Sequence, residues 1–167
     1  MALSMHAASV PVFRQLLASL ADLLGKAEAH ATEKKIDPAV LLQTRLFPDM
    51  FPLVRQVQIA CDFAKSVPAR LAGADVPAYD DSEQSFAELQ ARIAKTIAFI
   101  QTVPDSAFEG AEAKTITVKA GPRELTFPAV QYLNGYAIPN FYFHMTTAHN
   151  ILRSNGVEIG KVDFLGG

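Results

Sequence analysis

The chain has 167 residues, which is enough for one domain with a substantial core and short for two. Half of the residues are apolar and 19% are charged, a composition that predicts a packed globular domain and excludes a disordered one. The formal charge of −2, with no clustered basic stretch, excludes the usual nucleic-acid-binding protein. The nine glycines form neither the Rossmann nor the P-loop phosphate-binding pattern. We therefore predict one domain over residues 1–167.

Two further features limit the chemistry and the location. Cys61 is the only cysteine, so the chain forms neither an intramolecular disulfide nor a CxxC site. It lies in the apolar run VQIACDFA with no base beside it, which favours a buried packing residue over a nucleophile.

The stretch MALSMHAASV lacks the basic region and hydrophobic run of a signal peptide. No window approaches about 18 uninterrupted apolar residues, so we expect no membrane span and a cytoplasmic protein.

The first two thirds of the chain have the apolar period of amphipathic helices. Apolar residues recur at three- and four-residue intervals in three long segments, residues 10–31, 53–72 and 82–103. Between the first two, Asp37 followed by Pro38 predicts a short helix through Leu46. Gly73 is expected to end the second long helix. Asp81 or Ser82 is expected to cap the third.

The period changes to two after the third helix. Ile116 and Val118 alternate with polar residues, as do Leu125 and Phe127, and the two runs flank the sequence KAGPRE. This alternation predicts a short β-hairpin.

The last segment is again helical in pattern, but it is interrupted at Gly135 and Pro139. We expect a short helix, a break, and then a helix over residues 140–155, followed by an irregular tail. Four principal helices around one core, with the hairpin inserted before the last, make a mainly α-helical bundle.

The stretch NFYFHMTTAHN contains two histidines, His144 and His149. Residues five apart on a helix point roughly 140° from each other, whereas helical metal pairs use three- or four-residue spacing. Ala148 occupies the position four residues after His144, so the two histidines are not a ligand pair. His144 falls at the margin of the stripe that contains Phe141 and Met145. We interpret it as a packing residue with one nitrogen hydrogen-bonded and the other wet.

Polar side chains of the second long helix complete the set of candidate site residues. Arg55, Gln58 and Asp62 recur there at helical spacing. Their simplest interpretation is a solvated face with an interaction between residues four apart. Together with His144 and Tyr142 they form our candidate ligand pocket, and the sequence assigns no catalytic residue.

Three blocks of the sequence carry a family resemblance: RLFPDMFPLVRQVQIACD, FAELQARIAKTIAFI and NFYFHMTTAHNILRSNGVEIGKVDFLG. They resemble the signature blocks of an uncharacterised bacterial family, a domain of unknown function in the DinB/YfiT-like superfamily. The similarity covers essentially the whole chain. It implies an up-down-down-up four-helix bundle that is often dimeric. In well-studied members one histidine from the second helix and two from the last bind a divalent metal, and some members act as metal-dependent thiol transferases or hydrolases.

The histidine set that the resemblance implies is not present here. The second-helix stretch VRQVQIACD contains no histidine, and Ala148 stands where a second histidine of the last helix would be. Only His144 matches one of the three ligands. We therefore expect a degenerate metal site and no bound cofactor. A zinc or nickel ion held by His144 with Gln58 or Asp62 is the alternative.

These observations support three hypotheses about function. In the favoured one the bundle has lost the three-histidine site and works as a small-ligand-binding or interaction protein, as a homodimer. In the second, it is a transferase or hydrolase that uses a modified site around His144, with or without a metal. In the third, it is a structural dimer joined through the aromatic cluster of Phe141, Tyr142 and Phe143.

Overall fold

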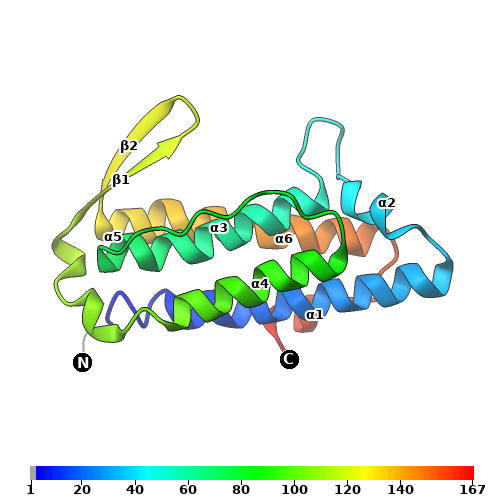
Figure 1. Cartoon of the computed structure of the whole chain (residues 1–167), viewed down its shortest axis with the longest axis horizontal. Coiled ribbons are helices and arrows are strands. Elements are labelled where there is room, and N and C mark those ends of the chain that lie inside the picture. The colour runs from blue at the N-terminus through cyan, green and yellow to red at the C-terminus, as the bar shows by residue number, and fades with distance from the viewer. Residues whose placement is uncertain (1–2) are drawn as a thin grey trace.

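Four long helices lie side by side and form the body of the molecule (Figure 1). The structure is a computed structural model that describes residues 3–167. The four helices are α1 (Val10–Lys34), α3 (Leu53–Ala72), α4 (Phe86–Gln101) and α6 (Ile138–Ser154). Followed along the chain in Figure 1, α1 and α6 run in one direction and α3 and α4 in the other. This confirms the predicted up-down-down-up bundle. Within residues 3–167, no helix combines the length and the apolarity that crossing a membrane requires.

The core lies between the four helices and is built from their apolar stripes. Phe13 of α1 and Phe141 of α6, both without exposed surface, meet edge to face with ring centroids 4.8 Å apart. Cys61 of α3 is also fully buried, and this burial raises the pKa of its thiol to about 12. A thiol that stays protonated is a poor nucleophile, so Cys61 packs the core as the sequence indicated.

Local capping chemistry explains where the shorter and later helices begin. Asp37 caps α2 (Pro38–Gln43) by accepting a hydrogen bond from the amide of Ala39 at 2.9 Å, as predicted. The cap of α4 is Ser85, not Asp81 or Ser82: its Oγ accepts from the Glu88 amide at 3.2 Å. Glu88 in turn accepts from the amide of Gln84, the residue before the cap, at 2.6 Å and from the hydroxyl of Ser85 at 3.1 Å. Residues before Ser85 are therefore free to follow a different path.

That path is a long crossover. Because α3 and α4 are parallel, the chain must return along the whole bundle between them, and residues 74–85 do so in extended form (Figure 1). We call residues 74–85 the strap. Gly73, at φ +78°, ends α3 in the left-handed conformation and directs the chain into the strap.

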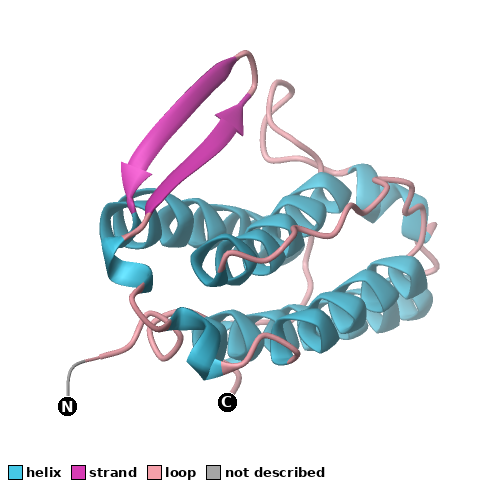
Figure 2. Ribbon diagram, turned by 60° about the vertical axis from the view of Figure 1, so that its left-hand side comes forward, coloured by secondary structure: helices cyan, strands magenta, loops and turns pink. Residues whose placement is uncertain are grey.

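The hairpin stands away from the bundle, on the side from which the loop of residues 44–52 also projects (Figure 2). It consists of β1 (Thr115–Ala120) and β2 (Arg123–Pro128), paired antiparallel with Val118 opposite Leu125. Two short 3₁₀ turns, Asp105–Phe108 and Ala111–Ala113, lead into it. Ile116 and Val118 are buried and attach the hairpin to the bundle, so the predicted alternation is confirmed.

The predicted break before the last helix is a π-helical turn. A short helix α5 (Ala129–Gln131) continues through the π-helical residues Tyr132–Ala137 directly into α6. The wider turn places Tyr132 and Tyr136 on one side, with ring centroids 6.1 Å apart. Pro139 is tolerated in the first turn of α6, which explains why this helix starts earlier than expected.

The tail is more ordered than the sequence indicated. It contains a short helix, α7 (Lys161–Leu165), which packs against α1. Asp163 accepts a hydrogen bond from the Gly160 amide at 2.7 Å and forms an ion pair with Lys26 of α1. These contacts hold the C-terminal segment on the bundle, and the prediction of an irregular tail was wrong for these five residues.

Candidate functional site

Two polar regions meet along α3, and the structure divides the predicted site residues between them. Gln58 and Asp62 face α4 and the strap, where they take part in an ion-pair cluster. His144 of α6 instead contacts Gln56, two residues earlier on α3. Tyr142 lies on the outer side of α6, with 39% of its surface exposed. The five candidates therefore do not form one pocket.

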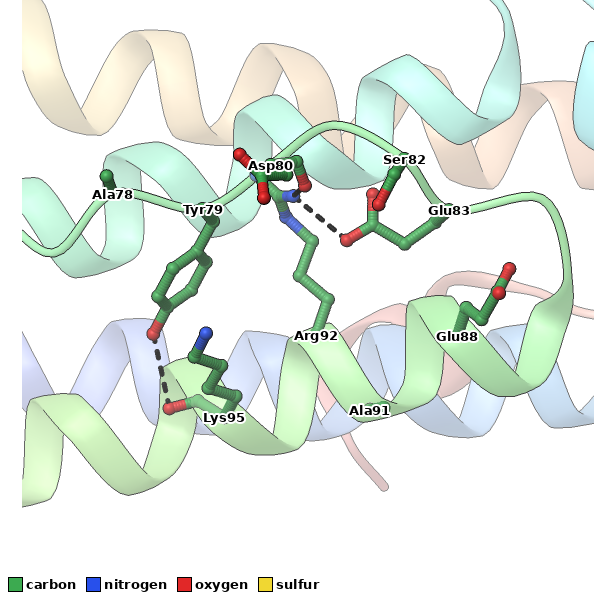
Figure 3. Close-up of a pocket in the computed structure, with 9 residues that line it drawn as sticks. All are labelled: Ala78, Tyr79, Asp80, Ser82, Glu83, Glu88, Ala91, Arg92 and Lys95. Atoms are coloured by element: carbon green, nitrogen blue, oxygen red, sulfur yellow. Dashed lines mark hydrogen bonds and ion pairs between the residues drawn. The ribbon is translucent and has the colours of Figure 1, made fainter.

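The ion-pair cluster centres on Arg92 of α4, whose side chain is only 2% exposed. Its Nη2 donates to Asp62 at 2.9 Å and lies 3.0 Å from Asp81, and its Nη1 donates to Glu83 at 3.0 Å. Nη1 also donates to the backbone carbonyl of Asp80 at 3.0 Å. Figure 3 shows Arg92 rising from α4 toward the strap residues Asp80 and Glu83. One buried guanidinium thus fastens the strap to both helices that it joins.

The remaining members of this cluster are also paired with one another. Gln58 donates to Glu83 at 2.8 Å and accepts from Arg55 at 3.3 Å. Arg55 forms an ion pair with Asp81 of the strap. Lys65 pairs with Asp62, and its Nζ lies 4.1 Å from the centre of the Tyr79 ring. Because each of these polar groups already has a partner within the protein, the simplest role of the cluster is to hold the crossover in place.

His144 and Gln56 form a buried hydrogen-bonded pair between α6 and α3. The Nδ1 atom of His144 lies 2.7 Å from Oε1 of Gln56. The Nε2 group of Gln56 donates to the backbone carbonyl of Phe51 at 3.0 Å, which fixes the orientation of the amide. The oxygen of Gln56 therefore faces His144, and Nδ1 is the nitrogen that carries the proton. Within residues 3–167, Nε2 of His144 makes no hydrogen bond, and it is not sealed from solvent.

The surroundings of His144 keep the imidazole neutral. Burial, and secondarily the charge of Arg55, lower its pKa from 6.5 to about 4. Phe63 stacks on the ring at a centroid distance of 6.3 Å, and Phe143 meets it edge-on at 5.3 Å. At neutral pH, His144 is a base with one free lone pair on Nε2.

Gln56 was not predicted as a site residue because it lies outside the polar face of the second long helix. Gln56 is 1% exposed and lies among the apolar residues of α3. The sequence feature that could have identified it is a single amide side chain within an apolar stripe, since a buried amide requires a hydrogen-bond partner.

A row of aromatic rings connects His144 with the hairpin. Phe127 of β2 stacks on Tyr136 at 5.2 Å, Tyr136 meets Phe63 of α3 at 5.9 Å, and Phe63 stacks on His144. The row runs from the hairpin over the π-helical turn to α3 and ends at His144 of α6. Phe63 and Tyr136 form part of the wall of a cleft with a volume of about 630 Å³.

This cleft lies between α3 and the hairpin and has a positive lining. Four cationic side chains and one carboxylate line it: Arg55, Lys65, Arg70, Lys119 and Asp62. Arg55 and Lys65 have acidic partners, but in the described part of the chain no carboxylate lies within 4 Å of Arg70 or Lys119. The only hydrogen bond of the Arg70 guanidinium there is to the hydroxyl of Tyr132, at 3.2 Å. Positive charge is therefore left over at this cleft.

The donors present do not fit a resident divalent metal of the three-histidine type. In residues 3–167, no three His, Cys, Asp or Glu side chains come together in a way that could hold an ion. The Gln56 side chain, which faces His144, is an amide that already forms two hydrogen bonds within the protein. Gln58 and Asp62 are bound within the strap cluster rather than to His144. The expected lack of a metal cofactor stays a prediction, and no metal chemistry is assigned to this site.

Comparison with known proteins agrees with the fold. A crystal structure of a DinB family member protein from Shewanella denitrificans is 43% identical in sequence, with a TM-score of 0.88. The match covers 98% of this chain and 92% of that one. No curated protein matches the sequence. A family model described as a domain of unknown function, DUF1993, matches residues 5–165. The chain therefore belongs to the DUF1993 family, and its bundle is that of a DinB-like protein.

Proposed function

We propose that the protein binds a small anionic molecule in the cleft between α3 and the hairpin. The observation that carries this proposal is the unbalanced charge: Arg70 and Lys119 line the cleft without a carboxylate partner. The other two cationic side chains of the cleft, Arg55 and Lys65, pair with Asp81 and Asp62, so Arg70 and Lys119 stand out. A guanidinium can bind a carboxylate or a phosphate through two parallel hydrogen bonds, and an ammonium adds a point charge.

The walls of the cleft favour a ligand with a flat apolar part. Phe51, Phe63 and Tyr136 line it beside the cations. A volume of about 630 Å³ lies in the ordinary range for small-molecule sites, in which aromatic walls supply affinity and a few polar groups fix orientation. A planar aromatic acid has both the negative charge that the cations would bind and the flat apolar part that the aromatic wall would contact.

The test uses 8-anilinonaphthalene-1-sulfonate, an aromatic anion whose fluorescence rises on binding to an apolar site. The cleft variant is Arg70→Met combined with Lys119→Met. The matched control is Arg153→Met combined with Lys161→Met, which removes the same charge from exposed positions of α6 and α7.

We expect the cleft variant to bind the probe about tenfold more weakly, a loss of ~1.4 kcal/mol, and the control to stay within a factor of two. Near-ultraviolet circular dichroism checks that each variant keeps its tertiary packing. Equal affinity of the cleft variant and the control would overturn the proposal.

The sequence-based predictions of a homodimer and of a cytoplasmic location accompany this proposal. The exposed faces of Tyr142 and Phe143 on α6, 39% and 57% accessible, support self-association. Light scattering tests the dimer: twice the chain mass of 18.1 kDa is expected, and a strict monomer at micromolar concentration would remove it.

A further inference from the structure

Within the proposed anion cleft, on which this inference rests, we infer that Tyr132 is the positioning residue of Arg70. Its hydroxyl holds one nitrogen of the guanidinium and leaves the opposite edge free for two oxygens of the anion. Tyr132 has no exposed surface, so it acts through Arg70 and does not touch the ligand itself. The bound group is then an oxyanion that presents two oxygens to that edge, as a carboxylate, a phosphate or a sulfonate does.

The contact between the two side chains joins the π-helical turn to α3. Nη1 of Arg70 donates to the Tyr132 hydroxyl at 3.2 Å, the only hydrogen bond of this guanidinium in the described residues. Within residues 3–167, Nη2 and Nε therefore have no protein partner, and neither atom is sealed from solvent. Because Arg70 lines the cleft, these two parallel donors are available to an anion bound there.

Tyr132 is a rigid support for the guanidinium. Its ring lies 6.3 Å from that of Phe127 on the hairpin and 6.1 Å from that of Tyr136, measured between ring centroids. Its backbone belongs to the π-helical residues Tyr132–Ala137, a conformation that is often found at functional sites. Tyr136, from the same turn, lines the cleft. One turn of backbone thus supplies both a wall of the cleft and the support of its arginine.

Tyr132 orients Arg70 without neutralising it. Burial raises the pKa of the phenol against the opposing effect of the Arg70 charge, so the phenol is uncharged at neutral pH. A carboxylate in its place would also orient the guanidinium, but it would compensate the charge that attracts the anion. Arg92 shows that alternative on the strap side, where three carboxylates surround the guanidinium. A neutral acceptor therefore suits a ligand-binding arginine.

The consequence for binding is a smaller loss of side-chain freedom. An unsupported arginine becomes ordered when it binds an anion, and this ordering weakens the affinity. Arg70 is already held through Nη1 before the anion arrives. We expect this support to strengthen binding about fivefold, which corresponds to ~1 kcal/mol.

A double-mutant cycle on anion binding tests this role. Wild type, Tyr132→Phe, Arg70→Met and the double variant are titrated with 8-anilinonaphthalene-1-sulfonate. Tyr132→Phe keeps the buried ring and removes only the hydroxyl. We expect it to weaken binding about fivefold in the wild-type background and by less than a factor of ~1.5 in the Arg70→Met background, where the hydroxyl has no guanidinium to hold.

The matched control is a second cycle in which Tyr136→Phe replaces Tyr132→Phe. Tyr136 lines the cleft, and its hydroxyl makes no hydrogen bond in the described residues. Its effect on binding, whatever the size, should be the same in the wild-type and the Arg70→Met background. Equal coupling of both tyrosines to Arg70 would overturn the inference, since a general disturbance of the cleft wall would then explain both cycles.

The outcomes separate the positioning role from the proposed function. If Arg70→Met weakens binding but Tyr132→Phe has no effect, or has the same effect in both backgrounds, the positioning role is wrong and the anion cleft stands. If the probe does not bind, or binds equally well to Arg70→Met, the proposed function fails and this inference fails with it.

A second measurement needs no ligand. In proton–nitrogen correlation spectra, a guanidinium held by a hydrogen bond rotates slowly and gives separate Nη signals, whereas a free one gives an averaged signal. We expect separate Nη signals for Arg70 in the wild type, identified by their loss in Arg70→Met, and an averaged signal in Tyr132→Phe. An averaged Arg70 signal in the wild type would overturn the inference whatever the probe does.

Discussion

The strap side and the cleft side of α3 use polar residues in different ways. On the strap side, the carboxylates of Asp62, Asp81 and Glu83 surround the buried guanidinium of Arg92. On the cleft side, Arg70 and Lys119 have no carboxylate within 4 Å in the described residues, and the Arg70 guanidinium donates to the hydroxyl of Tyr132. In the first region the carboxylates and cations are paired with one another, whereas the second keeps two cationic side chains without a carboxylate partner.

This difference indicates which region is structural. A crossover between parallel helices has no regular backbone hydrogen bonding, so side chains must fix it to the bundle. Arg92 does so through three residues of the strap and one of α3. Charged groups that are paired with one another are less available to bind a ligand. The charge density of the strap cluster is therefore a feature of folding, while the less charged cleft is the better place to look for binding.

The largest expected effect concerns Arg92. Arg92→Met leaves three carboxylates without their shared partner, and we expect the free energy of unfolding to fall by ~3 kcal/mol. Asp62 and Asp81 are 35% and 39% exposed, so water relieves part of the cost and the loss should lie at the lower end for buried pairs. Urea denaturation measures it, with Lys161→Met as the control. A loss below about 1 kcal/mol would mean that the strap is held by other contacts.

The next effect is the pH dependence that His144 imposes. Its pKa is lowered from 6.5 to about 4 in the folded protein, so between these values the unfolded chain binds a proton that the folded one does not. Stability from this group is complete above pH 6.5, and it decreases by a total of ~3 kcal/mol as the pH falls to 4. Below pH 4 the group adds no further change.

Denaturation at several pH values checks this, with the difference between wild type and His144→Phe isolating the histidine from the carboxylates that also titrate. Phe143→Leu serves as the matched control, because it removes a ring beside His144 but no titrating group. Parallel profiles of wild type and His144→Phe between pH 6.5 and 4 would contradict the predicted shift.

The smallest expected effect provides the sharpest contrast between the two regions. Lys119→Met should change the free energy of unfolding by less than ~0.5 kcal/mol, because Lys119 is exposed and has no ion pair in the described structure. We expect the same substitution to weaken the proposed anion binding. Urea denaturation again measures the stability, and a loss above about 1 kcal/mol would assign Lys119 to the fold rather than to the ligand.

Much of the fold could be predicted because each helix is determined locally. The apolar period set the four long helices, the alternation of Ile116 and Val118 set the hairpin, and Asp37 was correctly identified as a cap. The cap of α4 was misplaced because Asp81, Ser82 and Ser85 are all suitable residue types. The structure uses Asp81 to pair with Arg55 and Arg92, which leaves Ser85 to cap the helix.

The site was harder to predict because its members come from distant segments. Five-residue spacing was enough to show that His144 and His149 do not share a ligand, since helix geometry alone decides which side each residue faces. The assignment of Gln58 and Asp62 as companions of His144 has no support in the contacts, since both are held by the strap cluster. Besides neighbours on α3, their partners are Glu83 of the strap and Arg92 of α4, which the helix period cannot reveal.

By itself, the sequence determined the bundle, the hairpin and the lack of a two-histidine motif, because these depend on periods and spacings within single segments. Only the tertiary structure decided that Gln56 meets His144 across 88 residues of chain, that Arg92 gathers three carboxylates, and that Arg70 and Lys119 share a cleft. The reason is physical. A helical period fixes which residues share a face, whereas the packing of that face against others determines which polar group it meets.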